Sequence, residues 1–96
     1  CRVLSENPAR LYGLYPRKGV LRPGSDADIV VYDPGASHVI RAEDCVANVD
    51  YNPYEGFVTA GGIRQVWLRG QLSVENGKVL AEAPAGKYMA RGKNSL

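Results

Sequence analysis

A short run of branched apolar residues, enclosed by turn-forming residues, constrains the fold of this chain more than any other segment. The run Ile-Val-Val at 29–31 follows the polar turn at 24–28 and precedes Asp-Pro-Gly at 33–35. β-branched residues favour extended structure, whereas glycine, proline and aspartate mark the points where it ends. The segment therefore predicts one strand over 29–32, packed on both faces or nearly so.

Two further segments alternate between apolar and polar residues, which is typical of half-buried strands. Residues 37–41 form one candidate strand, and residues 42–44 are expected to turn the chain after it. Residues 63–69 show the best alternation in the chain. This segment contains Trp67, which we expect to be partly buried against the sheet.

Glycines mark the remaining strand boundaries. Asn76-Gly77 is the strongest hairpin signal, because a type I′ turn needs positive φ at both central residues. It predicts a hairpin between strands at 72–74 and 79–80. Gly61-Gly62, in contrast, is expected to end at once a weak strand that begins at residue 57.

The first fourteen residues predict a helix that is interrupted and then restarted. Asn7 is expected to cap the restarted helix, and Pro8 to lie in its first turn, where a missing N–H costs nothing. Gly13 is expected to end the helix in the left-handed conformation. Leu11 and Leu14 would share a buried face, for which this chain offers little to pack against.

Several segments, taken in order, resemble the carboxy-terminal end of hydantoinases and dihydropyrimidinases, the cyclic amidohydrolases that open hydantoin and dihydropyrimidine rings. Gly-Leu-Tyr-Pro-Arg-Lys-Gly at 13–19 is the segment most specific to that branch. Gly-Ser-Asp-Ala-Asp with the apolar run, at 24–31, is shared by many amidohydrolases. The resemblance continues to about Lys87, through the segments at 50–56, 66–70 and 75–79.

The resemblance implies a mainly β fold with a short N-terminal helix, as the carboxy-terminal part of the amidohydrolase composite β-sandwich domain. An intact parent would combine a (β/α)₈ barrel with that sandwich. Residues 1–14 would be a helix from the end of the catalytic barrel, 15–80 a β-sandwich segment, and 81–96 an extended carboxy-terminal arm. Because such a barrel takes about 250 residues, the 96 residues here are expected to be a fragment.

The resemblance also implies the chemistry of the parent. It would be a metal-dependent hydrolase with a divalent, dinuclear centre of zinc or a similar metal. Its partners would be the rest of its own polypeptide, namely the barrel and amino-terminal strands, and the other subunits of a cytoplasmic homotetramer whose arms cross between subunits. The family's metal-binding histidines, carboxylated lysine and catalytic aspartate have no counterpart here. The chain alone is therefore expected to be inactive, with no catalytic, cofactor-binding or metal residue.

The residues themselves favour the same interpretation. A dinuclear metal centre needs several histidines, and the chain has only His38, which is expected to be structural or exposed. Asp26 and Asp28 would lie on one side of an extended segment. They lack the further oxygen ligands of a calcium or magnesium site and a partner for acid–base work. We expect both to bond backbone N–H groups and fix the turn.

Five aromatic residues are expected to form a domain-packing surface in preference to one that stacks on a ligand. They are Tyr12, Tyr15, Tyr51, Tyr54 and Trp67.

Composition excludes several classes of function. The net charge of +2 is too small to indicate nucleic-acid binding, and the basic residues Lys87, Arg91 and Lys93 lie in a Gly-rich tail that is expected to be solvated. No apolar run approaches the length of a membrane helix. Cys1 and Cys45 are expected to be free thiols in a reducing cytosol.

Two alternatives to the hydantoinase interpretation stay open. One is another amidohydrolase branch, such as dihydroorotase, allantoinase or a non-catalytic dihydropyrimidinase relative. The other is an autonomous small β interaction module.

Overall fold

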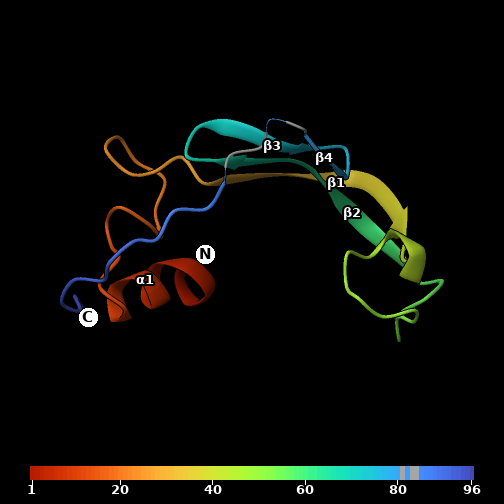
Figure 1. The fold of residues 1–96 in the computed structure, drawn as a ribbon, viewed down its shortest axis with the longest axis horizontal. Helices are drawn as coiled ribbons and strands as arrows, with labels where there is room; N and C mark the ends of the chain where they lie inside the picture. The colour runs from red at the N-terminus through yellow and green to blue at the C-terminus, as the bar shows by residue number, and fades with distance from the viewer. Residues whose placement is uncertain (81, 83–84) are drawn as a thin grey trace.

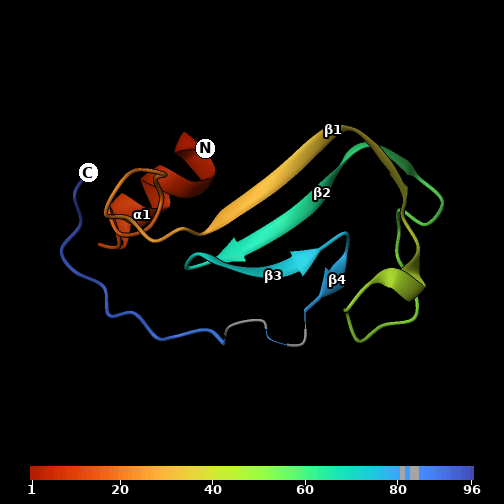
Figure 2. The ribbon, with the colours of Figure 1, turned by 90° about the horizontal axis from the view of Figure 1, so that it is seen from above.

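The chain folds into a curved antiparallel sheet with one short helical segment beyond its end (Figure 1). The computed structural model describes residues 1–80, 82 and 85–96. The prediction of a mainly β fold with a short N-terminal helix is confirmed. Residues 85–96 form neither helix nor strand and run back toward the helix, so that the carboxyl terminus lies beside it (Figure 2).

The sheet has four strands, and each strand pairs with the next one along the chain. They are β1 (Ile29–Val39), β2 (Val58–Leu68), β3 (Gln71–Glu75) and β4 (Lys78–Val79). All three pairings are antiparallel. The two long strands β1 and β2 form a ribbon, and β3 and β4 widen it at one edge.

Two predicted strands are in fact one. The segment predicted as a strand over 29–32 and residues 37–39 of the one predicted over 37–41 belong to β1, so Asp33-Pro34-Gly35 does not end the strand as expected. Residues 40–41 lie beyond the end of β1. The pairing with β2 slips between Asp33 and Ser37, which absorbs the proline and glycine as an irregularity. Because β1 is an edge strand of the sheet, the missing N–H of Pro34 can be tolerated there.

The prediction that Gly61-Gly62 ends a strand is also wrong, because β2 runs through both residues. Gly61 has φ of +99° and is buried. The ring of Tyr32 lies against it, and the Tyr32 hydroxyl donates a hydrogen bond to the Ala60 carbonyl at 2.9 Å. A Cβ on Gly61 would lie 1.9 Å from the Tyr32 oxygen. Gly61 therefore provides space for an aromatic ring of the neighbouring strand.

The hairpin prediction is confirmed. Asn76 and Gly77 have φ of 50° and 80°, as a type I′ turn requires, and they join β3 to β4. The turn expected at 42–44 is a 3₁₀ helix, η2 (Ala42–Asp44).

The N-terminal segment is one continuous helical rod. A π-helix, η1 (Arg2–Glu6), leads directly into α1 (Asn7–Leu11). Asn7 is therefore not an N-cap: its φ of −62° and ψ of −45° are helical, because no free helix end exists at this point. Gly13 does end the helix in the left-handed region, with φ of +70°.

The described residues enclose no hydrophobic core of their own. Among the described residues, Ala9 is the only buried apolar side chain, and Leu11 is 48 % exposed. The accessible surface is 7769 Å², against about 5,400 Å² for a compact monomer of this mass. The radius of gyration is 15.9 Å, against about 12.5 Å for a compact domain of this length. Contrary to the prediction for residues 29–32, the first strand is not packed on both faces within this chain.

The substitution Gly61→Ala tests whether the Tyr32 ring needs the space that Gly61 provides. We expect it to lower the free energy of unfolding by about 2 kcal/mol, because the new methyl group adds an overlap with the ring to the strain of a positive φ. Gly56→Ala is the matched control, since Gly56 also has a positive φ, of +85°, but no atom within 4 Å of an added Cβ. Urea unfolding measures both. Equal losses for the two variants would show that the Tyr32 contact is unimportant.

Candidate functional site

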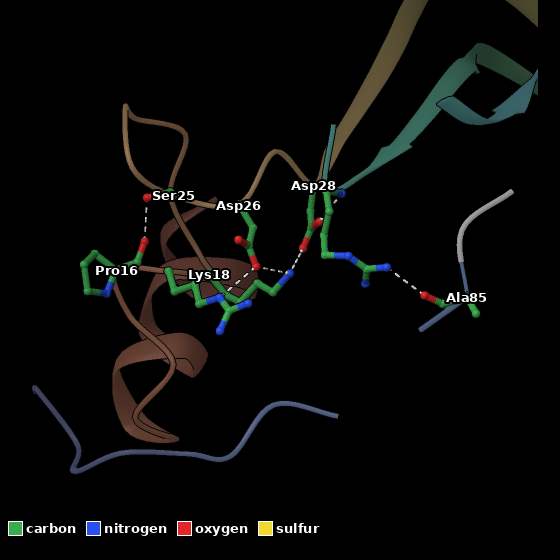
Figure 3. A network of polar contacts seen from close by, with 8 residues as sticks. Pro16, Lys18, Ser25, Asp26, Asp28 and Ala85 are labelled. Atoms are coloured by element: carbon green, nitrogen blue, oxygen red, sulfur yellow. Dashed lines mark hydrogen bonds and ion pairs between the residues drawn. The ribbon is translucent and has the colours of Figure 1, made fainter. Parts of the chain in front are cut away.

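The densest polar cluster lies where the loop after the helix meets the sheet, and we call its residues Arg17, Lys18, Asp26 and Asp28 the ionic junction (Figure 3). The Lys18 ammonium contacts Asp26 Oδ2 at 2.9 Å and also pairs with Asp28 Oδ2. Arg17 Nε lies 3.1 Å from Asp26 Oδ2. One lysine thus holds together two carboxylates that follow it by eight and ten residues.

Asp28 also ties this loop to the sheet. Its Oδ1 accepts a hydrogen bond from the backbone N–H of Arg69 at 2.9 Å. The N–H of Gly70 donates to the Ala27 carbonyl at 3.0 Å. Arg69 lies in the turn between β2 and β3, with a positive φ of 47°. The junction therefore fixes the loop against one end of the two central strands.

The expected role of the two aspartates is confirmed for Asp28 and wrong for Asp26. Asp28 binds a backbone N–H group, as predicted. The Asp26 carboxylate pairs instead with Lys18 and Arg17. The two cations precede it across a loop rich in glycine and proline, which brings them back to the carboxylate. The adjacent Arg-Lys pair was the signal that could have identified this partner.

Electrostatics keep the junction charged over a wide range of pH. The hydrogen bond from Lys18 is the main cause that lowers the pKa of Asp26. Partial burial works to raise the pKa of Asp28, but hydrogen bonds from Lys18 and from the Arg69 N–H outweigh it and leave this pKa below its ordinary value. Partial burial likewise opposes the raised pKa of Lys18, which hydrogen bonds to both carboxylates produce.

These residues do not fit a metal centre or a catalytic acid–base pair. Both carboxylates are occupied by a lysine, and no histidine or cysteine stands beside them to complete a set of ligands. His38 is exposed in β1, where it pairs with Thr59. In the part of the chain that the structure describes, no three residues among His, Cys, Asp and Glu gather in one place.

One side of the sheet carries a row of apolar side chains, which we call the apolar face. Strand pairing aligns its members across all four strands, and they are Val30, Tyr32, Ile63, Val66, Val74 and Val79. Four of the six are between 56 % and 71 % exposed. An antiparallel sheet normally buries such a face against another layer. Among the described helices and strands, none packs on this face to supply that layer.

The opposite side carries Trp67, which is partly buried, as expected. Its indole N–H donates to Gln65 Oε1 at 3.2 Å, and its Cα neighbours across the sheet are Ile29 and Leu72. This pairing places a second group of apolar residues on the other side of the sheet.

The aromatic residues do not gather into one surface. Tyr15 lies under the guanidinium of Arg10, whose Cζ is 3.6 Å from the ring centre, close to the helix. Tyr51 and Tyr54 lie in the loop between β1 and β2, at the far end of the sheet in Figure 1, where Tyr54 meets Phe57 edge to face at 6.0 Å. A single ligand-stacking surface built from them is excluded by this separation.

Both cysteines are exposed free thiols. Within the described ranges, no helix has the length and apolar character needed to cross a bilayer.

Stability should depend on pH at both extremes. The carboxylates have lowered pKa values, so their contribution is complete above the unfolded pKa near 3.8 and is lost as pH falls through the lower folded values. The raised pKa of Lys18 gives a contribution that is complete below about 10.5 and is lost as pH rises past the folded value. Asp28→Asn should flatten the acid limb of the curve.

Asp44→Asn is the control for this experiment, because Asp44 makes no ion pair among the described residues. The stability of both variants is measured as the urea concentration at the midpoint of unfolding, at pH values between 2 and 12. An unchanged acid limb in Asp28→Asn would contradict the role assigned to the junction.

Comparison with known proteins places this geometry in context. The model of the amidohydrolase family matches residues 1–79. The chain is 48 % identical over 89 residues to the D-hydantoinase of Streptomyces coelicolor and 41 % identical over 89 residues to a D-phenylhydantoinase of Escherichia coli. Each match includes 93 % of this chain and 19 % of the relative. The chain thus spans about a fifth of the length of the curated relatives that it matches.

Solved structures give the same result at the level of the fold. The dihydropyrimidinase from Brevibacillus agri superimposes with a TM-score of 0.84 at 40 % identity, over 96 % of this chain and 20 % of its own. A D-hydantoinase from a Bacillus species superimposes with a TM-score of 0.83 at 38 % identity, over the same shares. The helix and the sheet therefore recur together within much longer proteins. The chain belongs to the amidohydrolase family, and within it to the segment shared with hydantoinases and dihydropyrimidinases.

Proposed function

We propose that this chain is the carboxy-terminal, non-catalytic β part of a metal-dependent hydrolase that opens cyclic amides such as hydantoins and dihydropyrimidines. One observation carries the proposal: almost all of the chain matches hydantoinases at 41–48 % identity, yet it spans only a fifth of them. In this assignment residues 1–14 close the catalytic barrel, 15–80 belong to the β-sandwich, and 81–96 form the arm.

The role of the chain in such an enzyme is structural. Its apolar face would pack against strands from the amino-terminal part of the same polypeptide and complete the sandwich. Full burial of one large aliphatic side chain contributes about 1.5–3 kcal/mol, and the face offers six apolar side chains that are exposed or half-buried here. Covering it would therefore stabilise both layers.

Catalysis would lie entirely outside these residues. Hydrolysis of a cyclic amide requires a polarised carbonyl and an activated water, which a divalent metal supplies when it is bound to the barrel. His38 is exposed, and Asp26 and Asp28 are paired with Lys18. These side chains provide neither the ligands nor the base. We propose a dinuclear centre of zinc or a similar metal in the parent alone.

Two observations separate this proposal from the alternatives. An autonomous interaction module needs a core of its own, and Ala9 is the only buried apolar residue in the described chain. The names of the matched relatives favour the hydantoinase branch over dihydroorotase or allantoinase. We further propose that the parent is a cytoplasmic homotetramer, and the exposed free thiols Cys1 and Cys45 suit a reducing compartment.

A segment graft tests the proposed function. This chain replaces the aligned segment of the Streptomyces coelicolor D-hydantoinase, and ring opening of hydantoin and dihydrouracil is measured. We expect the graft to retain activity within about tenfold, because a structural segment need only preserve packing. The chain alone, supplied with zinc or manganese, should show no turnover. Metal-dependent turnover by the chain alone, or a folded graft without activity, would contradict the proposal.

A charge placed on the apolar face tests whether the parent covers it. Val30→Asp should be tolerated in the isolated chain, where Val30 is 57 % exposed, but should cost the graft about 2 kcal/mol or more, because it buries an unpaired charge. Val46→Asp is the matched control, since Val46 is fully exposed in the loop away from that face. The melting temperature is measured for each of the two variants, in the isolated chain and in the graft. Equal tolerance of Val30→Asp in the chain and the graft would show that the face stays open.

A further inference from the structure

The helical segment and the sheet do not contact each other directly. Among the described residues, η1 and α1 contact each other, and each strand contacts only its neighbours in the sheet. The position of the helix relative to the sheet therefore depends on the segments that connect them. One of these is the ionic junction, and the other is the arm at 85–96 (Figure 2).

The arm is bonded at both of its ends. Near the sheet, the guanidinium of Arg69 donates to the Ala85 carbonyl at 2.8 Å (Figure 3). At the helix, the N–H of Gly92 donates to the Gly13 carbonyl at 2.8 Å, and the N–H of Ser95 donates to the Arg10 carbonyl at 3.0 Å. The arm thus bridges the turn after β2 and the carboxyl end of α1.

The contact with the helix end satisfies a physical requirement. The last carbonyl groups of a helix have no partner within the helix and need donors from elsewhere. The Ser95 N–H is a second donor to the Arg10 carbonyl, which also accepts the Gly13 N–H at 3.3 Å, and the Gly92 N–H donates to the Gly13 carbonyl in the turn after α1.

The close approach depends on glycine. A Cβ on Gly13 would lie 2.1 Å from the Gly92 carbonyl oxygen, and Gly13 has a positive φ of 70°. A Cβ on Gly92 would lie 3.3 Å from the Gly13 carbonyl oxygen. Gly13 is therefore the residue at which a side chain cannot be accommodated, because the backbone of the arm lies directly against it.

We propose that residues 85–96 form a strap that holds the helix in a fixed position relative to the sheet, with the Gly13–Gly92 contact as its latch. The ionic junction is the second tether, and the loop at 12–28 is the hinge between them. When the latch opens, the helix moves relative to the sheet while both keep their internal structure. The proposal concerns this chain alone and does not depend on the parent's activity.

The two native cysteines allow a direct test. Cys1 lies at the start of the helix and Cys45 in the loop beyond β1, and both are exposed. Spin labels on these thiols report the distance between the helix and the loop that joins β1 to β2 at the far end of the sheet. Amide hydrogen exchange at Ser95 reports the latch. In the unmodified chain we expect a narrow distance distribution and an exchange rate at Ser95 at least tenfold below that of an unfolded chain.

Two pairs of variants separate the latch from general effects. Gly92→Pro removes the N–H that bonds to Gly13, whereas Ala90→Pro removes one for which no bond is found among the described residues. Gly13→Ala adds the clash, whereas Gly56→Ala, outside the hinge, adds only the strain of a positive φ, because nothing lies within 4 Å of its Cβ. The first member of each pair should broaden the distance distribution and speed exchange at Ser95 at least tenfold. The control member should do neither.

The amides of Asn76 and Leu80, which are bonded within the sheet, report whether each variant is folded. If these amides are unprotected in the isolated chain, the same four variants are made in the grafted hydantoinase. Hydrogen exchange of its peptide at 87–96 is then measured in place of exchange at Ser95. An unprotected Ser95 in the unmodified folded protein, or a Gly92→Pro variant that matches Ala90→Pro in both measurements, would overturn the strap.

Discussion

The backbone pairing of β1 with β2 is the interaction on which the rest of this structure depends. Because only Ala9 among the described apolar residues is buried, the shape of the molecule comes from hydrogen-bonded ladders more than from a packed interior. The ribbon positions β3 and β4, aligns the apolar face and presents the turn at Arg69 to the ionic junction. A pairing error of one residue would move that face to the other side of the sheet.

The sequence predicted local features well wherever a short-range requirement decides them. The positive φ values of Asn76 and Gly77 and the left-handed stop at Gly13 follow from turn chemistry that two or three residues contain. The sequence-based prediction was wrong where a contact with a neighbouring strand determines the local structure. Gly61 was read as a strand end, although the ring of Tyr32, from β1, explains it. Asn7 was misread as a cap because a π-helix before it cannot be recognised from local residue preferences.

The candidate site shows the same division. That Asp28 would bond a backbone N–H could be inferred from its place before a strand, but its donor, Arg69, lies 41 residues away in the chain. The adjacent cations Arg17 and Lys18 indicate a pairing with carboxylates, but only the path of the loop at 19–25 shows that the partners are Asp26 and Asp28. The family resemblance predicted the fold more completely than local residue patterns did, because it rests on the order of segments along the chain. The family model and the relatives match nearly the full chain.

Pro34 has a consequence for association between molecules. β1 forms the outer edge of the sheet, and Pro34 interrupts the row of N–H donors along that edge, beside an irregularity in the pairing. An open strand edge next to an exposed apolar face is a template for cross-strand aggregation. A residue that cannot donate a hydrogen bond, placed in the middle of that edge, shortens the stretch that another strand could extend. Pro34, which was predicted to end the strand, thus limits the pairing of β1 with a strand of another molecule.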